Sequence, residues 1–252
     1  MKVLVSGASG RVGEELVKNL VADGHQVVAG TRHIDQDFGA GVQVKNIDLL
    51  DNEATLVDEL QALELDAIYF VAGSRGKNLL QVDAFGAVKL STAADKLGIT
   101  RFIMLSSWQS LQPSEWKVER MMNYNIAKFF GDNWLIDHTE LDYTILQPVD
   151  LVEEPATGKV DLDPKDAGTG TNTIGDVAKV LSEMLERENT FKRVISMRQG
   201  ETSIKSALSK RKQMANCSAY AGLALRAANG ELNLLPFAEL TDDKNGWNFD
   251  NY

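Results

Sequence analysis

Two groups of residues in this 252-residue chain have the types and spacing needed to bind a phosphate group or to move a proton. The first is a run of three glycines near the amino terminus, Gly7, Gly10 and Gly13, spaced three residues apart. The second is Ser107 followed by Tyr124 and Lys128, the last two four positions apart. Each group is weak as a pattern alone, so its meaning depends on the elements that carry it.

The glycine run stands between a predicted strand and a predicted helix. The short apolar run Val3–Val5 favours a buried strand. The residues after the glycines repeat with helical spacing on one face: Val12, Leu16, Val17 and Leu20. Strand, glycine turn and helix together are the context that a dinucleotide-binding turn requires, although the spacing here is G-x-x-G-x-x-G. A plain strand-to-helix turn that happens to carry three glycines is the alternative.

The three glycines have separate expected roles. Gly7 lets the chain turn sharply, Gly10 leaves room for a pyrophosphate beside the backbone, and Gly13 lets the helix pack closely on the sheet. Free N–H groups at the helix start, with the helix dipole behind them, then face the phosphates.

The second group predicts acid–base chemistry on a carbonyl or an alcohol. Tyr124 and Lys128 share one face of a predicted helix over about 118–137, and Ser107 follows a predicted strand over 101–105. A nearby ammonium stabilises a phenolate, and a serine hydroxyl can donate to a carbonyl oxygen. Together they could protonate or deprotonate that oxygen while a hydride moves. The alternative is a helix with a packed tyrosine and a surface lysine.

Arg32 favours a cofactor that carries a 2′-phosphate. It follows the predicted strand 26–31, whose end lies near the adenine ribose in a doubly wound fold. An acid there selects NAD, whereas the planar guanidinium of an arginine suits phosphate. A solvated arginine in a loop is the alternative. Asp48, at the end of a strand predicted over 42–47, is a weaker candidate for holding adenine.

Strand and helix signals alternate along most of the chain, which predicts an α/β fold with a mainly parallel, doubly wound sheet and helices on both faces. Further strands are expected over 66–71, 141–146 and 193–197, and further helices over 51–63, 78–97 and 173–188, with Asp51 as a helix cap. Residues 147–172 are predicted to form a long loop, which suggests a functional role.

Composition narrows the class of protein. Hydrophobic residues make up 44% and charged residues 25%, as in ordinary globular proteins. A net charge of −10 disfavours nucleic acids and anionic membranes as partners. The single cysteine excludes an intramolecular disulfide, and the three histidines lack metal-ligand spacing, so we expect no metal. No transmembrane stretch or signal peptide is evident, so a cytoplasmic protein is expected.

The chain resembles the atypical branch of the short-chain dehydrogenase/reductase superfamily, the NAD(P)H-binding proteins related to NmrA and to biliverdin reductase B. Motifs in family order carry the resemblance over about residues 1–208: the glycine turn, Thr31-Arg32, Asp48-Leu49, Ala72-Gly73-Ser74, Leu105-Ser106-Ser107, Tyr124 to Lys128, Leu141 to Pro148 and Asp176-Val177-Ala178. The chain departs from the family at Gln147-Pro148-Val149, where Arg-Pro-Gly is common.

The resemblance implies a Rossmann-type domain over 1–208, including a small substrate region (147–172 and 193–208), and an extension of unknown role over 209–252. It implies a catalytic set of Ser107, Tyr124 and Lys128. It also implies a set of residues around the cofactor: Gly7, Ser9, Gly10, Arg11, Val12, Gly13, Arg32, Asp48, Leu49, Ala72, Gly73, Lys128 and Pro148.

The expected function is an NADP-dependent oxidoreductase, with NAD possible as cofactor, or an enzyme resembling a nucleotide-sugar epimerase, acting on a small molecule as a monomer or homodimer. A non-catalytic NAD(P)-binding redox sensor is the alternative, because the family resemblance settles the fold and not turnover.

Overall fold

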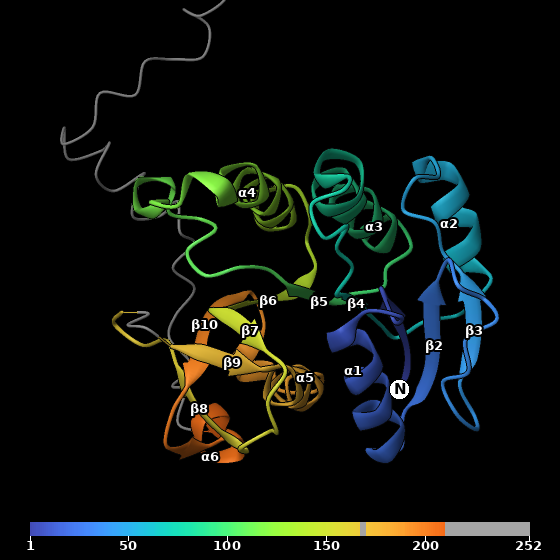
Figure 1. Cartoon of the computed structure of the whole chain (residues 1–252). Helices are drawn as coiled ribbons and strands as arrows, with labels where there is room; N and C mark the ends of the chain where they lie inside the picture. Colours follow the sequence, from blue (N-terminus) through green and yellow to red (C-terminus); the bar gives the residue numbers. More distant parts are fainter. Residues whose placement is uncertain (167–169, 210–252) are drawn as a thin grey trace, which may run out of the picture. The chain divides into compact units, whose positions relative to one another are not determined.

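The computed structural model describes residues 1–166 and 170–209 (Figure 1). Within these ranges nine strands form one sheet in the order β11-β8-β10-β6-β5-β4-β1-β2-β3. Their bounds are β1 (Lys2–Ser6), β2 (Gln26–Thr31), β3 (Gln43–Asn46), β4 (Ala67–Phe70), β5 (Arg101–Leu105), β6 (Asp142–Pro148), β8 (Lys159–Leu162), β10 (Arg193–Gln199) and β11 (Thr202–Ser203). The predicted α/β fold with a mainly parallel, Rossmann-type sheet is therefore confirmed.

The strand order reverses between β1 and β4. β2 and β3 extend the sheet on one side of β1, while β4, β5, β6 and β10 extend it on the other, and all of these pairings are parallel. β8 and β11 continue the edge with antiparallel pairings. In sheets of this kind ligands bind beyond the carboxyl ends of the strands at the point of reversal.

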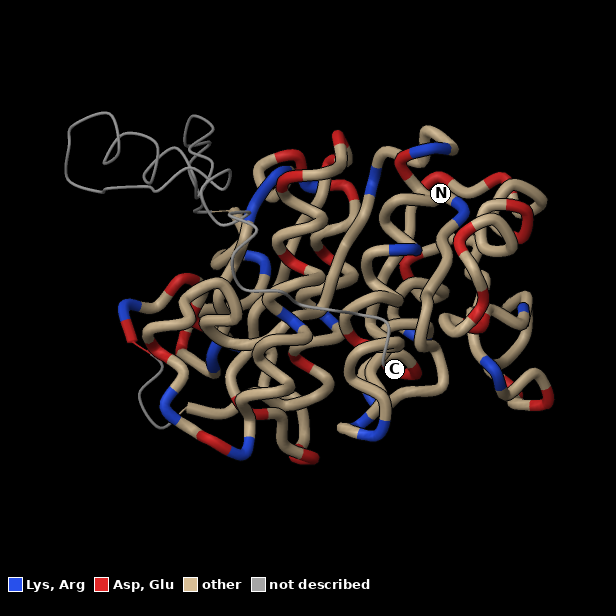
Figure 2. Tube along the Cα trace, turned by 90° about the horizontal axis from the view of Figure 1, so that it is seen from above, with Lys and Arg blue, Asp and Glu red and all other residues tan. Residues whose placement is uncertain are grey.

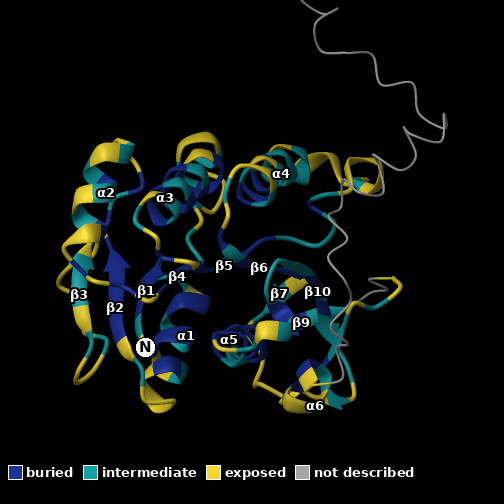
Figure 3. Ribbon diagram, turned by 180° about the vertical axis from the view of Figure 1, so that it is seen from behind, coloured by how far each residue is buried: buried dark blue, intermediate teal, exposed yellow. Residues whose placement is uncertain are grey.

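Helices cover both faces of the sheet (Figure 1). α1 (Arg11–Ala22) and α5 (Ile174–Glu183) pack side by side on one face. α2 (Glu53–Gln61), α3 (Phe85–Lys96) and α4 (Met122–Asp137) cover the other, and α6 (Ile204–Ser209) lies beside β8. The central strands β1, β4 and β5 are buried between these layers, whereas the edge strand β3 is partly exposed and many exposed residues lie on the outer sides of the helices (Figure 3).

The alternation of side chains along each strand divides the core into two clusters. Val3 and Val5 of β1 pack with α1 and α5, while Leu4 between them packs with the opposite helices. β4 does the same, with Tyr69 on the first side and Phe70 on the second. Because both faces are covered, these strands read as continuous apolar runs in the sequence.

Glycines allow a tight turn between β1 and α1. Gly7 has φ +90°, and a Cβ there would stand 2.6 Å from the backbone of Ala72. A Cβ on Gly13 would stand 2.2 Å from the carbonyl oxygen of Gly7. Gly10 precedes the first residue of α1, and a Cβ there would have only one close neighbour, the Gly7 carbonyl oxygen at 3.2 Å. The separate roles predicted for Gly7 and Gly13, turning and close packing, match these contacts.

The prediction of a continuous loop over 147–172 is wrong. β6 extends to Pro148, and β7 (Asp150–Val152), β8 and β9 (Thr171–Thr173) follow, with β7 pairing in parallel with β9. A buried carboxylate, Asp176 of α5, holds this segment: it accepts hydrogen bonds from the backbone N–H groups of Thr157 and Gly158 at 2.9 and 2.8 Å. Such long-range partners leave no local signal in the sequence.

Other predicted bounds need smaller corrections. β3 ends at Asn46, so Asp48 lies beyond the strand, and Asn52 caps α2 in place of Asp51. The helix predicted over 78–97 begins as a π-helix, η1 (Leu79–Ala84). The helix predicted from 118 begins with a 3₁₀ turn, η3 (Glu119–Met121), and the one predicted to reach 188 ends at Glu183, ahead of the 3₁₀ turn η4 (Glu188–Thr190).

Charged residues are spread over many helices and loops, with acidic and basic positions interspersed (Figure 2). Across 1–166 and 170–209, no helix combines the length and the apolar character needed to cross a membrane. The extension predicted from residue 209 lies, apart from Ser209, outside the described residues.

Replacing Gly13 by alanine tests the close packing of the turn. The new Cβ would overlap the Gly7 carbonyl oxygen, so the free energy of unfolding should fall by about 1–3 kcal/mol, the usual cost of overpacking. Urea denaturation measures this. Gly10→Ala, whose Cβ would meet that oxygen at 3.2 Å, is the matched control and should cost less. An equal decrease in the free energy of unfolding for Gly13→Ala and Gly10→Ala would contradict this account.

Candidate functional site

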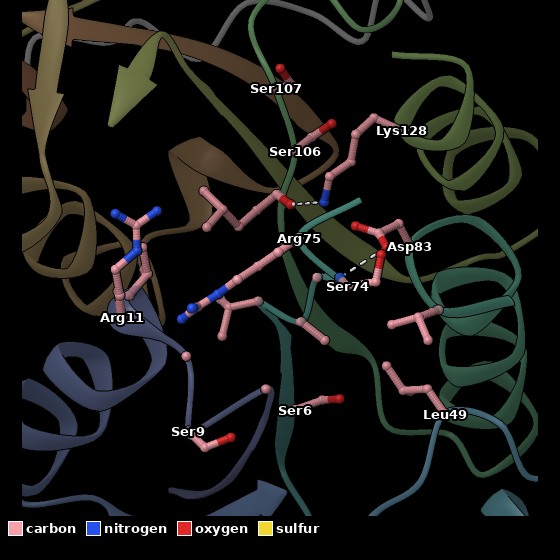
Figure 4. A pocket seen from close by; sticks show the side chains of 18 of the residues that line it. Ser6, Ser9, Arg11, Leu49, Ser74, Arg75, Asp83, Ser106, Ser107 and Lys128 are labelled. Carbon is pink, nitrogen blue, oxygen red and sulfur yellow. Dashed lines mark hydrogen bonds between the residues drawn. The ribbon is translucent and has the colours of Figure 1, made fainter. Parts of the chain in front are cut away.

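A cavity of about 740 Å³ opens at the carboxyl ends of β1, β2, β4 and β5, where the strand order reverses. Its walls come from the glycine turn, the loop after β4, the loop after β5 and the first two turns of α4 (Figure 4). This volume lies within the range of small-molecule and cofactor sites. Segments that are far apart in the sequence therefore meet around one cavity.

One end of the cavity is built from the glycine turn and the end of β2. Gly7 and Ala8 donate backbone hydrogen bonds to the carbonyl oxygen of Gly30, which ties the turn to β2. The Thr31 hydroxyl donates to Ser9 Oγ at 3.0 Å. No side chain caps the start of α1, so its first N–H groups remain for other acceptors. Arg32, beyond Thr31, is exposed and lines this end.

The other end brings the predicted acid–base residues together. Lys128 is 5% exposed, and its Nζ donates to the carbonyl oxygen of Leu105 at 3.0 Å. The same Nζ lies 5.8 Å from the centre of the Tyr124 ring, one helical turn earlier. Ser107 follows β5 and lines the same cavity (Figure 4). Thus all three residues of the predicted set reach one end of the cavity.

Of the thirteen residues predicted around the cofactor, twelve line the cavity: Gly7, Ser9, Gly10, Arg11, Val12, Arg32, Asp48, Leu49, Ala72, Gly73, Lys128 and Pro148. Gly13 does not line it. It is buried beneath the turn and acts through packing. Gln147, where the chain departs from the family pattern, turns inward, and its Nε2 donates to Ser110 Oγ at 2.7 Å.

Sequence reasoning missed a buried polar cluster behind the cavity. Asp132 lies on α4 one turn after Lys128 and is fully buried. Its Oδ2 accepts from Ser106 Oγ at 2.6 Å, from the Ser110 hydroxyl, and from Gln147 Nε2 at 3.4 Å. These bonds join α4 to the loop after β5 and to β6, and so they fix the backbone beside Ser107. The only local hint of this cluster in the sequence was that Lys128 and Asp132 stand four positions apart, and therefore share one face of α4.

Burial governs the ionisation of this cluster. Loss of solvent raises the pKa of Asp132 to about 6, even though the hydrogen bonds from Ser106 and Ser110 and the charge of Lys128 favour the carboxylate. Asp132 Oδ1 has no hydrogen-bond partner in the described part of the chain. A buried carboxylate with one unpaired oxygen carries an uncompensated desolvation cost.

A second buried carboxylate, also missed, anchors the loop after β4. Asp83 of η1 is 2% exposed, and its Oδ2 accepts from the backbone N–H of Ser74 at 3.0 Å (Figure 4). A Cβ on Gly73 would stand 3.3 Å from the other oxygen of Asp83. Asp83 and the loop it holds both line the cavity, together with Arg75 and Lys77.

Cations outnumber anions in the cavity wall, although the chain as a whole is acidic. The lining includes five lysines and arginines and three aspartates: Arg11, Arg32, Arg75, Lys77, Lys128, Asp48, Asp83 and Asp150. Arg11 is paired with Glu153 at 3.0 Å, in an exposed contact. The local excess of positive charge favours an anionic ligand.

A sequence profile of a family described as NAD(P)H-binding matches residues 7–188. The chain is 35% identical to a Bacillus subtilis protein named as an uncharacterized sugar epimerase, YhfK, over 83% of this chain and 100% of that protein. It is 32% identical to the UPF0659 protein YMR090W of Saccharomyces cerevisiae, over 79% of this chain and 94% of that protein.

A solved structure agrees with these sequence relatives. The oxidoreductase ylbE of Lactococcus lactis has 39% sequence identity to this chain and superimposes with a TM-score of 0.81. The likeness covers 86% of this chain and 100% of that one. Fold and sequence therefore point to the same family, over the segments that build the cavity.

Asp132→Asn tests the buried carboxylate through the pH dependence of stability. Because the folded-state pKa lies above the ordinary value of 3.8, the ionised form costs stability. That cost is absent below about pH 3.8 and complete above about pH 6. The asparagine variant should therefore gain up to about 3 kcal/mol of unfolding free energy relative to the parent as pH rises from 4 to 7.

Urea denaturation at several pH values measures this difference. Asp58→Asn, at an exposed position on α2, is the matched control for removing a carboxylate outside the buried cluster. A difference between Asp132→Asn and the parent that does not change with pH would show that the Asp132 carboxyl titrates alike in the folded and unfolded protein.

Proposed function

The chain belongs to an NAD(P)H-binding family of the atypical short-chain dehydrogenase/reductase type, and from this premise we propose that it is an NADP-dependent oxidoreductase. It acts on a small molecule that carries a carbonyl or an alcohol group. The observation that carries the proposal is the single cavity that joins the glycine turn at one end to Ser107, Tyr124 and Lys128 at the other.

The cavity fits a dinucleotide. The turn offers uncapped N–H groups of α1, and Gly10 places no side chain over them. The cationic lining matches a ligand with two or three phosphates. When bound, the nicotinamide ring supplies or accepts the hydride. The protein's contribution is to hold that ligand, orient the substrate and move a proton.

The proton step is assigned to Tyr124. Its phenol donates a proton to the substrate oxygen as a carbonyl is reduced, or accepts one as an alcohol is oxidised. Lys128, with Nζ 5.8 Å from the Tyr124 ring centre, stabilises the phenolate that results. Ser107 donates a hydrogen bond to the same substrate oxygen and orients it. The bond from Lys128 to the Leu105 carbonyl keeps the ammonium in place beside the phenol.

A second candidate is suggested by the relative named as a sugar epimerase. In that version the same three residues act on a nucleotide sugar, and the cofactor ends each cycle in its starting state. A panel of carbonyls, alcohols and nucleotide sugars separates the two. Net absorbance change at 340 nm identifies the oxidoreductase, and a new sugar isomer by NMR without net change identifies the epimerase. Tight NADPH binding without turnover of any compound would favour the sensor.

Arg32→Ala tests cofactor choice. Because Arg32 follows β2 at the end of the cavity expected for the adenine ribose, the parent should bind NADPH more tightly than NADH. The substitution should narrow that gap by about 1.5–3 kcal/mol, the scale of a charge-assisted hydrogen bond. Calorimetric titration of both cofactors measures it. Equal affinities in the parent would remove the case for a 2′-phosphate contact.

Tyr124→Phe tests the proton step with any substrate found. The ring and its packing remain while the acid is lost, so turnover should fall on the order of 10²- to 10⁴-fold with little change in cofactor affinity. Lys128→Met is the companion variant, and it should weaken both turnover and cofactor binding. Full activity in Tyr124→Phe would assign this tyrosine to packing alone.

A further inference from the structure

The loop after β4 holds an arginine that the proposed function has not used. Arg75 has φ +52°, a left-handed conformation that residues other than glycine seldom adopt, and Gly76 follows with φ +81°. Such backbone conformations persist only where the surroundings enforce them, and they gather at functional sites.

The base of this loop is fixed on both sides. The backbone N–H of Ser74 donates to the buried Asp83 at 3.0 Å, and the N–H of Lys77 donates back to the Ser74 carbonyl at 3.1 Å. Ala72 packs so closely on Gly7 that the glycine turn has no room for a Cβ there. The tip, Arg75–Gly76, must therefore reverse within two residues.

The reversal sends the Arg75 side chain back across the cavity, toward the glycine turn (Figure 4). Although Arg75 lines the cavity, no hydrogen bond or ion pair joins it to any other residue in the described ranges, and the residue is exposed. Arg11 on the opposite wall is paired with Glu153, and Lys128 is bonded to Leu105. Arg75 is thus a cation aimed at the centre of the cavity with its donors unused.

Because the Arg75 side chain lies opposite the glycine turn, its position determines which part of a ligand it can bind. Phosphates seated on the first N–H groups of α1 would have the turn on one side and the Arg75 guanidinium on the other. The guanidinium offers donors in a planar fork, which matches two phosphate oxygens at once. Arg32 stands at the end of β2, so the two arginines meet different parts of a dinucleotide.

We infer that Arg75 is a cofactor-binding residue whose guanidinium contacts the pyrophosphate of the dinucleotide, opposite the glycine turn. This inference rests on the proposed binding of NAD(P). Arg75 accordingly strengthens binding of NADPH and NADH alike, whereas Arg32 distinguishes between them. Asp83 is a positioning residue for Arg75, because it holds the loop from which the arginine projects.

Ligand dissection tests this assignment. Arg75→Gly removes the side chain and keeps a residue suited to φ +52°. Its affinities for NADPH, NADH and ADP-ribose should fall by a similar factor of roughly tenfold or more. Its affinity for adenosine 2′-monophosphate, which lacks a pyrophosphate and is measured by displacement of NADPH, should stay within about twofold. Arg75→Lys, which keeps the charge and loses the fork, should recover part of the loss.

Two controls separate failure of this inference from failure of the proposed function. Lys205→Ala, at an exposed position on α6 and outside the cavity lining, should bind all four ligands as the parent does, and thermal melting confirms that each variant is folded. If the parent binds none of the ligands, the proposed function fails. If the parent binds them and Arg75→Gly matches Lys205→Ala, only the role of Arg75 is overturned. The role of Arg75 is also overturned if Arg75→Gly loses as much affinity for adenosine 2′-monophosphate as it loses for NADH.

Discussion

The close approach of the glycine turn to its neighbours is the constraint on which the cavity depends. At Gly7 the chain leaves no room for a side chain against Ala72, and at Gly13 the helix lies against the Gly7 carbonyl. These contacts bring the start of α1 and the end of β4 together at the point where the strand order reverses. The site exists because two backbones meet there without side chains between them.

Buried carboxylates carry this arrangement outward from the turn. Asp83 holds the loop after β4, Asp132 holds the loop after β5, and Asp176 holds the segment that leads into β8. Each is at most 2% exposed and accepts hydrogen bonds from a loop outside its own helix. Loops around the cavity are thereby attached to the helices behind them. Asp132 does so at a cost, since burial raises its pKa to about 6.

The fold also places positive charge at the cavity. Although the chain carries a net charge of −10, five lysines and arginines line this one cavity. Lys128 is buried and bonded, Arg11 is paired at the rim, and Arg75 is held in reach of the turn by backbone geometry. Positive charge near α1 and a buried ammonium beside Tyr124 give the two ends of the cavity different side chains, and the proposed function assigns binding to one end and proton transfer to the other.

Local pattern in the sequence determined the parallel α/β fold, the glycine turn, strands such as 26–31 and 101–105, and the residues Ser107, Tyr124 and Lys128. These follow from strand and helix periodicity and from spacings within one element, which neighbours along the chain decide. Only the tertiary structure decided that β7, β8 and β9 arise after β6, that Gln147 turns inward, and that Arg75 faces the turn. The contacts that decide these features join Thr157 to Asp176, Gln147 to Ser110 and Ser74 to Asp83, and hydrogen bonds between elements leave no periodic signal in the sequence.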